Sequence, residues 1–62
     1  MNKLQETRTA AGLTQKQLAE KAGLSYSLIC KYERGEKDIT KAQYMTVRKL
    51  CEVLNCNPDD II

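Results

Sequence analysis

The residue types that most often perform catalysis or hold metal ions are scarce in this chain. Its 62 residues include no histidine and three cysteines, Cys30, Cys51 and Cys56, none of them in a C-x-x-C pair. This odd set predicts neither a zinc site nor a disulfide framework, so we interpret the cysteines as reduced packing residues of a cytoplasmic protein. The sequence also offers no glycine-rich phosphate-binding loop and no nucleophile paired with a general base. We therefore expect no enzyme, no metal site and no cofactor.

The polar residues that do form a pattern lie on one short segment, residues 26–34. On a helical wheel, Ile29 and Tyr32 point inward and the polar residues point outward. The outward residues are Ser27, Cys30, Lys31 and Arg34, with Tyr26 projecting sideways from the first turn. This side is basic at one end and nearly free of acids, which suits an anionic partner, although a solvated basic surface has the same pattern. Tyr26 could equally cover the edge of the core.

Helix signals around this segment predict the elements that position it. Hydrophobic residues recur with a period of 3.6 along most of the chain, and no stretch alternates as a strand does. Polar capping residues precede four of the helices, and residues suited to left-handed backbone follow four of them. The capping residues are Thr14, Ser25, Thr40 and Asn57, and the terminating residues are Gly12, Gly23, Gly35 and Asn55. These signals predict five helices, at about 2–11, 15–22, 26–34, 41–54 and 58–62.

The apolar faces of these helices predict an all-α fold with one core, in a single domain of residues 1–62. The expected core residues are Leu4, Thr7, Ala11, Leu18, Ala19, Ala22, Ile29, Tyr32, Val47, Leu50, Cys51 and Leu54. A chain this short buries only roughly 60% of its unfolded surface, which leaves little room for a substrate-sized cavity. The longest apolar run is Leu28 to Cys30. That is far below the ~20 residues of a membrane span, so we expect no membrane segment.

Residues 14–35 have the pattern of a helix-turn-helix, in which two short capped helices are joined by a tight turn. The pattern requires a small residue where the helices cross, a glycine in the turn and a branched apolar residue on the second helix. Ala19, Gly23 and Ile29 meet these three requirements. Leu18 and Tyr32 supply the apolar sides of the two helices. Five positions therefore agree with this motif at once.

The motif G-L-T-Q-K-Q-L-A-E-K-A-G-L-S at 12–25, followed by I-C-K-Y-E-R-G at 29–35, resembles the central signature of the lambda-repressor/Cro-like (Xre) family of helix-turn-helix DNA-binding domains. The closing residues, 50–62, are similar to the last two helices of that family. The resemblance implies a compact five-helix bundle whose third helix, at about 25–34, enters the major groove of double-stranded DNA. It also implies a sequence-specific transcriptional regulator, and we expect a repressor of bacterial, phage or mobile-element origin.

The resemblance assigns expected roles to individual residues. The residues expected to contact base edges are Tyr26, Ser27 and Lys31. The residues expected to contact the DNA backbone are Gln15, Ser25, Arg34, Lys37 and Lys41. Arg8 and Glu33 match a pair that forms a structural ion pair between the first helix and the end of the third. Two features depart from the family pattern: Tyr26 stands where glutamine or arginine is common, and the loop 36–43 is longer than the common form.

The expected partners are double-stranded DNA and a second copy of the chain. A single module of this kind reads one half-site, so we expect a homodimer on a palindromic operator. The fourth and fifth helices offer the apolar residues Val53, Ile61 and Ile62 for the dimer contact. The net charge of +2 is small for a nucleic-acid binder, although its excess falls within residues 14–35. The alternative is a protein-interaction or antitoxin-like module that keeps the helix-turn-helix fold.

Overall fold

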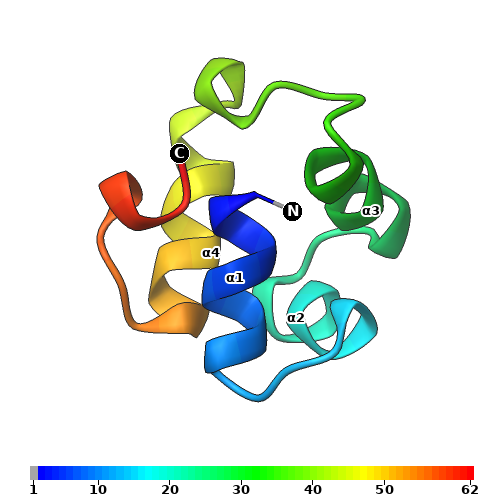
Figure 1. Ribbon diagram of the computed structural model, residues 1–62, viewed down its shortest axis with the longest axis vertical. Helices are drawn as coiled ribbons and strands as arrows, with labels where there is room; N and C mark the ends of the chain where they lie inside the picture. The colour runs from blue at the N-terminus through cyan, green and yellow to red at the C-terminus, as the bar shows by residue number, and fades with distance from the viewer. Residues whose placement is uncertain (1) are drawn as a thin grey trace.

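The computed structural model describes residues 2–62 as a small bundle of short helices (Figure 1). Met1, the first residue of the expected domain, lies outside the described residues. The elements are α1 (Lys3–Ala10), α2 (Gln15–Ala22), α3 (Tyr26–Arg34), the 3₁₀ helix η1 (Ile39–Lys41), α4 (Tyr44–Leu54) and the 3₁₀ helix η2 (Pro58–Asp60). Helix α2 packs against both α3 and α4, whereas α1 contacts α3 and η2. Residues 2–62 contain no β-strand, so the all-α expectation is confirmed for them.

Helices α2 and α3 begin where the sequence predicts. The Thr14 Oγ1 accepts a hydrogen bond from the Gln17 amide at 3.0 Å, and the Gln17 side chain accepts one from the Thr14 amide at 2.9 Å. This reciprocal pair satisfies two amides that the helix itself leaves without a partner. Ser25 caps α3 in the same way, with its Oγ accepting from the Leu28 amide at 3.1 Å. Between them, Gly23 ends α2 with φ of 68°, a left-handed conformation that glycine adopts without a Cβ penalty.

The expected helix at 41–54 starts later, because Asp38 rather than Thr40 organises the backbone before it. The Asp38 carboxylate accepts from both the amide and the hydroxyl of Thr40, at 3.0 and 2.6 Å. These bonds give the Thr40 amide a local partner, so the chain forms the single 3₁₀ turn η1 here instead of starting α4. The same bonds lower the pKa of Asp38. Helix α4 then begins at Tyr44, after Gln43, which makes no side-chain capping bond. The prediction that Thr40 caps this helix is wrong.

The expected fifth helix at 58–62 is also wrong. Pro58–Asp60 form one 3₁₀ turn, closed by a bond of 3.1 Å from the Ile61 amide to the Pro58 carbonyl. The Asp60 carboxylate caps it by accepting from the Asn57 amide at 2.9 Å. So short a segment cannot offset the cost of nucleating an α-helix. The part of the chain described by the structure therefore contains four α-helices and not five.

The core lies where the four α-helices and η2 meet. Its buried hydrophobic residues are Leu4, Leu18, Ala19, Ala22, Ile29, Tyr32, Leu50, Cys51, Leu54 and Ile61. Three predictions need correction: Ala11 is exposed, and Thr7 and Val47 are only half-buried. Ile61, expected on a dimer surface, is instead 2% exposed, because the η2 turn folds its side chain back into the core.

None of the helices in residues 2–62 has the length and apolar character needed to span a membrane.

Candidate nucleic-acid interface

The residues expected to contact base edges lie on the outer side of α3. Ile29 and Tyr32 anchor this helix in the core, which leaves the opposite side toward solvent. Ser27 and Lys31 are exposed there, and Tyr26 is 54% exposed on the first turn. Helix α3 is thus held by two apolar side chains and presents a polar, partly basic surface on the side away from the core.

A buried ion pair fixes the C-terminal end of α3 to α1. The Arg8 guanidinium donates to both carboxylate oxygens of Glu33, from Nε at 2.7 Å and from Nη2 at 3.1 Å. Its Nη1 donates to the Leu13 carbonyl at 2.7 Å, so one arginine joins three segments. The side chains of Arg8 and Glu33 are only 13% and 3% exposed. No buried side-chain nitrogen or oxygen among the described residues lacks a hydrogen-bond partner. The ion pair therefore orients α3 and leaves no buried charge uncompensated.

Gln15, the first residue of α2, extends this network toward the outer side of α3. Its Nε2 donates to the Glu33 Oε1 at 3.0 Å, and its Oε1 accepts from the Cys30 thiol at 3.5 Å. The side chain is half-buried between α2 and α3. One hydrogen of the Gln15 side-chain amide remains to meet an anionic oxygen, together with the backbone amides of Gln15 and Lys16, because the Gln17 amide is already bonded to Thr14. The contacts of Gln15 with Glu33 and Cys30 were not predicted from the sequence, because nothing local links residues 15, 30 and 33.

The comparisons with known proteins agree with this geometry. A helix-turn-helix family model matches residues 4–61. The chain belongs to the helix-turn-helix family. A solved structure, the restriction-modification controller protein C.AhdI from Aeromonas hydrophila, is 33% identical, with a TM-score of 0.83 over 97% of this chain and 86% of that one. A comparison with curated proteins gives no significant match. This helix-turn-helix protein is thus a DNA-binding transcriptional regulator, in a family that is not one of enzymes.

The residues expected at the DNA backbone are spread around the helix-turn-helix. Ser25 is exposed at the start of α3, although its hydroxyl oxygen already accepts the capping bond. Arg34 is exposed at the end of α3 and forms a surface ion pair with Glu36 at 2.8 Å. Exposed pairs of this kind are weak and can exchange for a phosphate. Lys37 and Lys41 lie beyond α3, on the rim of a hollow of about 380 Å³.

Tyr26 and Cys30 are neighbours one turn apart on α3. The neighbouring Cys30 side chain is the main cause of a raised pKa of the Tyr26 hydroxyl, and the charge of Arg34 opposes this effect. One cysteine on this surface, Cys30, thus lies beside two residues expected to contact DNA, Tyr26 and Gln15.

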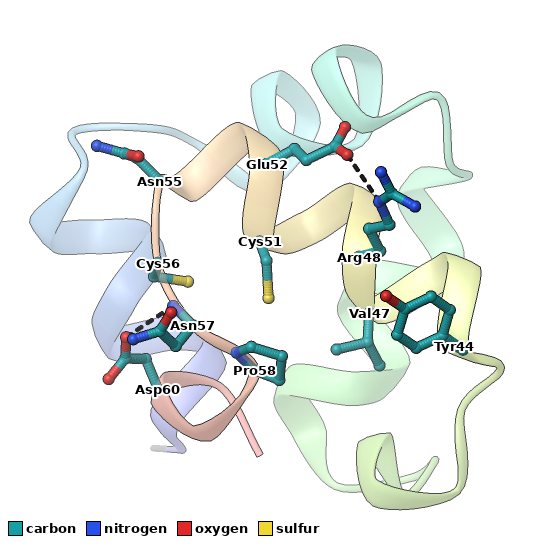
Figure 2. Close-up of a pocket in the computed structure, with 10 residues that line it drawn as sticks. All are labelled: Tyr44, Val47, Arg48, Cys51, Glu52, Asn55, Cys56, Asn57, Pro58 and Asp60. Carbon is teal, nitrogen blue, oxygen red and sulfur yellow. Dashed lines mark hydrogen bonds and ion pairs between the residues drawn. The ribbon is translucent and has the colours of Figure 1, made fainter.

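A second surface feature lies on the far side of the core from α3. Helix α4 and the residues around η2 border an open groove of about 500 Å³, with Tyr44 and Val47 at one end (Figure 2). Tyr44 is 71% exposed at the rim of this groove. The thiols of Cys51 and Cys56 face this groove. Burial raises the pKa of both thiols, that of Cys56 to about 11, so both stay protonated at neutral pH.

Proposed function

We propose that this helix-turn-helix protein is a homodimeric repressor that docks α3 in the major groove of a palindromic operator. The observation that carries the proposal is the outer side of α3, where Tyr26, Ser27 and Lys31 project from a helix locked to α1 and α2. A helix in the major groove reads base edges through a few side chains of this kind. A bound repressor acts by occupying its site, which needs no contact beyond DNA.

The charge distribution supports the same face. Residues 14–35 carry four basic and two acidic side chains. Glu33, one of the two acids, is buried and paired with Arg8 rather than facing solvent. The positive charge of Lys31 is therefore not cancelled by an acid on α3, whereas Arg34 shares a weak exposed ion pair with Glu36 just beyond the helix. We assign phosphate contacts to Gln15, Ser25, Arg34, Lys37 and Lys41, which surround the base-reading residues.

We propose that the second copy docks along α4 and η2. A dimer is needed because one module reads only one half-site, and two half-sites about one helical turn apart give a dimer its affinity. The groove of Figure 2, with Tyr44 and Val47 in its lining, offers apolar surface for this contact. Met45 on α4 and Ile62 after η2 are further exposed apolar side chains. Ile61 is excluded from the contact by its burial.

The similarity to a restriction-modification controller protein supports a role in a bacterial, phage or mobile-element gene system. In that setting the protein acts in the cytoplasm, on double-stranded DNA.

Selection from random-sequence DNA tests the proposal, followed by titration of the best site with variants. Ser27→Ala and Lys31→Ala should weaken binding to the selected site, each by about 5- to 100-fold for the loss of a base contact. Lys49→Ala removes an exposed lysine from α4 and serves as the control with unchanged base readout. The proposal is refuted if the selection enriches no sequence and both α3 variants bind DNA as the wild-type protein does. That result would favour the protein-interaction or antitoxin-like module.

A further inference from the structure

The side-chain amide of Gln15 is held by two partners of opposite kind. Its Nε2 donates to the Glu33 Oε1 at 3.0 Å, and its Oε1 accepts from the Cys30 thiol at 3.5 Å. A carboxylate only accepts hydrogen bonds, so the amide nitrogen has to face Glu33, whereas the thiol is a donor and matches the amide oxygen. Turning the amide over would place its oxygen against the carboxylate. Both contacts therefore favour the same orientation.

Glu33 is a fixed partner, because the Arg8 guanidinium holds both of its carboxylate oxygens. Arg8 donates to Oε2 at 2.7 Å and to Oε1 at 3.1 Å, so Oε1 is shared between Arg8 and Gln15. The Glu33 side chain is 3% exposed, whereas Gln15 and Cys30 are half-buried. The hydrogen-bond network therefore extends from the buried ion pair to the surface between α2 and α3.

One hydrogen of the Gln15 amide has no acceptor in this network. Nε2 carries two hydrogens, and among the described residues only Glu33 accepts from it. Oε1 is turned toward Cys30 on α3. A phosphate oxygen of DNA accepts hydrogen bonds from neutral side chains as well as from cations. The free hydrogen of Nε2, and not Oε1, is thus the group with which Gln15 can meet the DNA backbone.

We propose that Cys30 is a positioning residue that, together with Glu33, directs the free Nε2 hydrogen of Gln15 to a phosphate of the DNA backbone. The thiol holds Oε1, the amide atom that Glu33 does not contact, and so limits rotation about the last side-chain bond of Gln15. A side chain that is already held loses less conformational freedom when it binds. Cys30 thus contributes to affinity without contacting the DNA. This inference rests on the proposed docking of α3 and on the backbone contact assigned to Gln15.

A phosphate contact made by a neutral amide differs from one made by a cation in its salt dependence. Counterions are released where Lys or Arg neutralises a phosphate. Gln15→Ala should therefore weaken binding at every salt concentration and leave the slope of log affinity against log salt unchanged. A phosphate contact also carries no sequence information, so the base preferences of the selected site should be the same in Gln15→Ala and in the wild-type protein.

Methylphosphonate substitution of single phosphates in the selected site identifies the partner of Gln15. At one phosphate of each half-site, the substitution should cost the wild-type protein at least about tenfold more affinity than it costs Gln15→Ala. This factor is the one expected for a hydrogen bond to a charged group. On unmodified DNA, Cys30→Ala should weaken binding about two- to tenfold, the range for one side chain that loses its freedom on binding.

A double-mutant cycle separates positioning from other roles of Cys30. In the Gln15→Ala background, Cys30→Ala should have no measurable effect, because no amide is left to position. Cys30→Ser keeps a donor for the Gln15 Oε1 and should bind like the wild-type protein. Lys49→Ala, on the exposed side of α4, is the control that should weaken binding equally little in both backgrounds. A merely structural role, or a direct contact of Cys30 with DNA, would give the same loss with and without Gln15.

The free protein gives an independent readout, which does not depend on DNA. The ¹⁵N order parameter of the Gln15 Nε2 group, measured by NMR relaxation, should fall in Cys30→Ala and stay at the wild-type value in Cys30→Ser and Lys49→Ala. The same spectra show whether each variant is folded. An order parameter that is unchanged in folded Cys30→Ala would overturn the inference.

The outcomes separate this inference from the proposed function. If the wild-type protein selects a site that Lys31→Ala weakens, but no phosphate of that site depends on Gln15, the inference fails alone. It also fails alone if Cys30→Ala binds like the wild-type protein, or if its effect persists in the Gln15→Ala background. If the wild-type protein selects no sequence, both the docking of α3 and the role of Cys30 are refuted.

Discussion

Replacing Arg8 by methionine should reveal how strongly the buried ion pair holds the DNA-binding helix. Methionine keeps most of the apolar stem of arginine but removes all three guanidinium bonds, two to Glu33 and one to the Leu13 carbonyl. Glu33 then keeps a single side-chain partner, Gln15, at 3.0 Å. The side chain of Glu33 is 3% exposed, so water cannot take the place of the arginine without local opening of the fold.

The magnitude follows from this burial. Removing one partner of a buried pair costs about 3–5 kcal/mol, because it leaves an uncompensated charge. At about 0.05–0.15 kcal/mol per residue, a chain of 62 residues has a free energy of unfolding of about 3–9 kcal/mol. Arg8→Met should therefore remove a large part of the total stability. Arg48→Met is the matched control, because Arg48 pairs with Glu52 at 3.1 Å on the exposed side of α4, where a pair contributes about 0.3–0.5 kcal/mol.

Urea unfolding, followed by circular dichroism at low temperature, measures both variants. The double variant Arg8→Met with Glu33→Leu tests the mechanism, since it removes the stranded charge and should be more stable than Arg8→Met alone by at least about 1 kcal/mol. Equal effects of Arg8→Met and Arg48→Met would refute the reasoning. A double variant no more stable than Arg8→Met would also refute it, because the loss would then come from packing rather than from an unpaired carboxylate.

Three further predictions concern DNA affinity, the backbone and pH. Arg34→Ala should reduce the slope of log affinity against log salt by about 0.9 per protomer if Arg34 meets a phosphate, whereas Lys49→Ala should leave the slope unchanged. Asn55 ends α4 with φ of 53°, so Asn55→Ala should lower the free energy of unfolding by about 1 kcal/mol and Asn55→Gly should not, as urea unfolding can determine. The pKa of Cys56 rises to about 11 on folding, so the unfolded chain loses this proton first. Stability should therefore fall between about pH 9 and 11, and less steeply in Cys56→Ala, when melting is compared across that range.

The helix-turn-helix itself could be predicted from the sequence because its signals are local. The bonds that begin α2 and α3 join residues three positions apart, such as Ser25 and Leu28, and the left-handed turn at Gly23 needs only the glycine. Amphipathic periodicity then identified most of the core. Such features depend on neighbours within one helical turn, which a sequence displays directly.

The predictions from sequence were wrong or incomplete where the structure depends on a choice between competing hydrogen-bond partners or on residues far apart in the chain. Asp38 and Thr40 are both good capping residues, and the sequence alone did not reveal that the carboxylate of Asp38 takes both donors of Thr40. Ile61 looks exposed in a terminal helix but is buried once the chain turns at η2. The bond of Cys30 to Gln15 joins residues 15 positions apart and has no periodic signal. The base and phosphate contacts stay predictions, since they concern a partner and not the chain itself.

The anchoring of α1 by residues far along the chain has a consequence for the order of folding during synthesis. Asn2 caps α1 through the Gln5 amide, but its Nδ2 donates to the Tyr32 carbonyl at 2.7 Å. Arg8 depends in the same way on Glu33, and Thr7 donates to the Asp60 carbonyl at 3.1 Å. Helix α1 is synthesised first, but its partners Tyr32, Glu33 and Asp60 emerge from the ribosome only later. Until residue 33 emerges, α1 has only its own weak helical propensity, so a chain cut short before that point should be an early target for proteolysis.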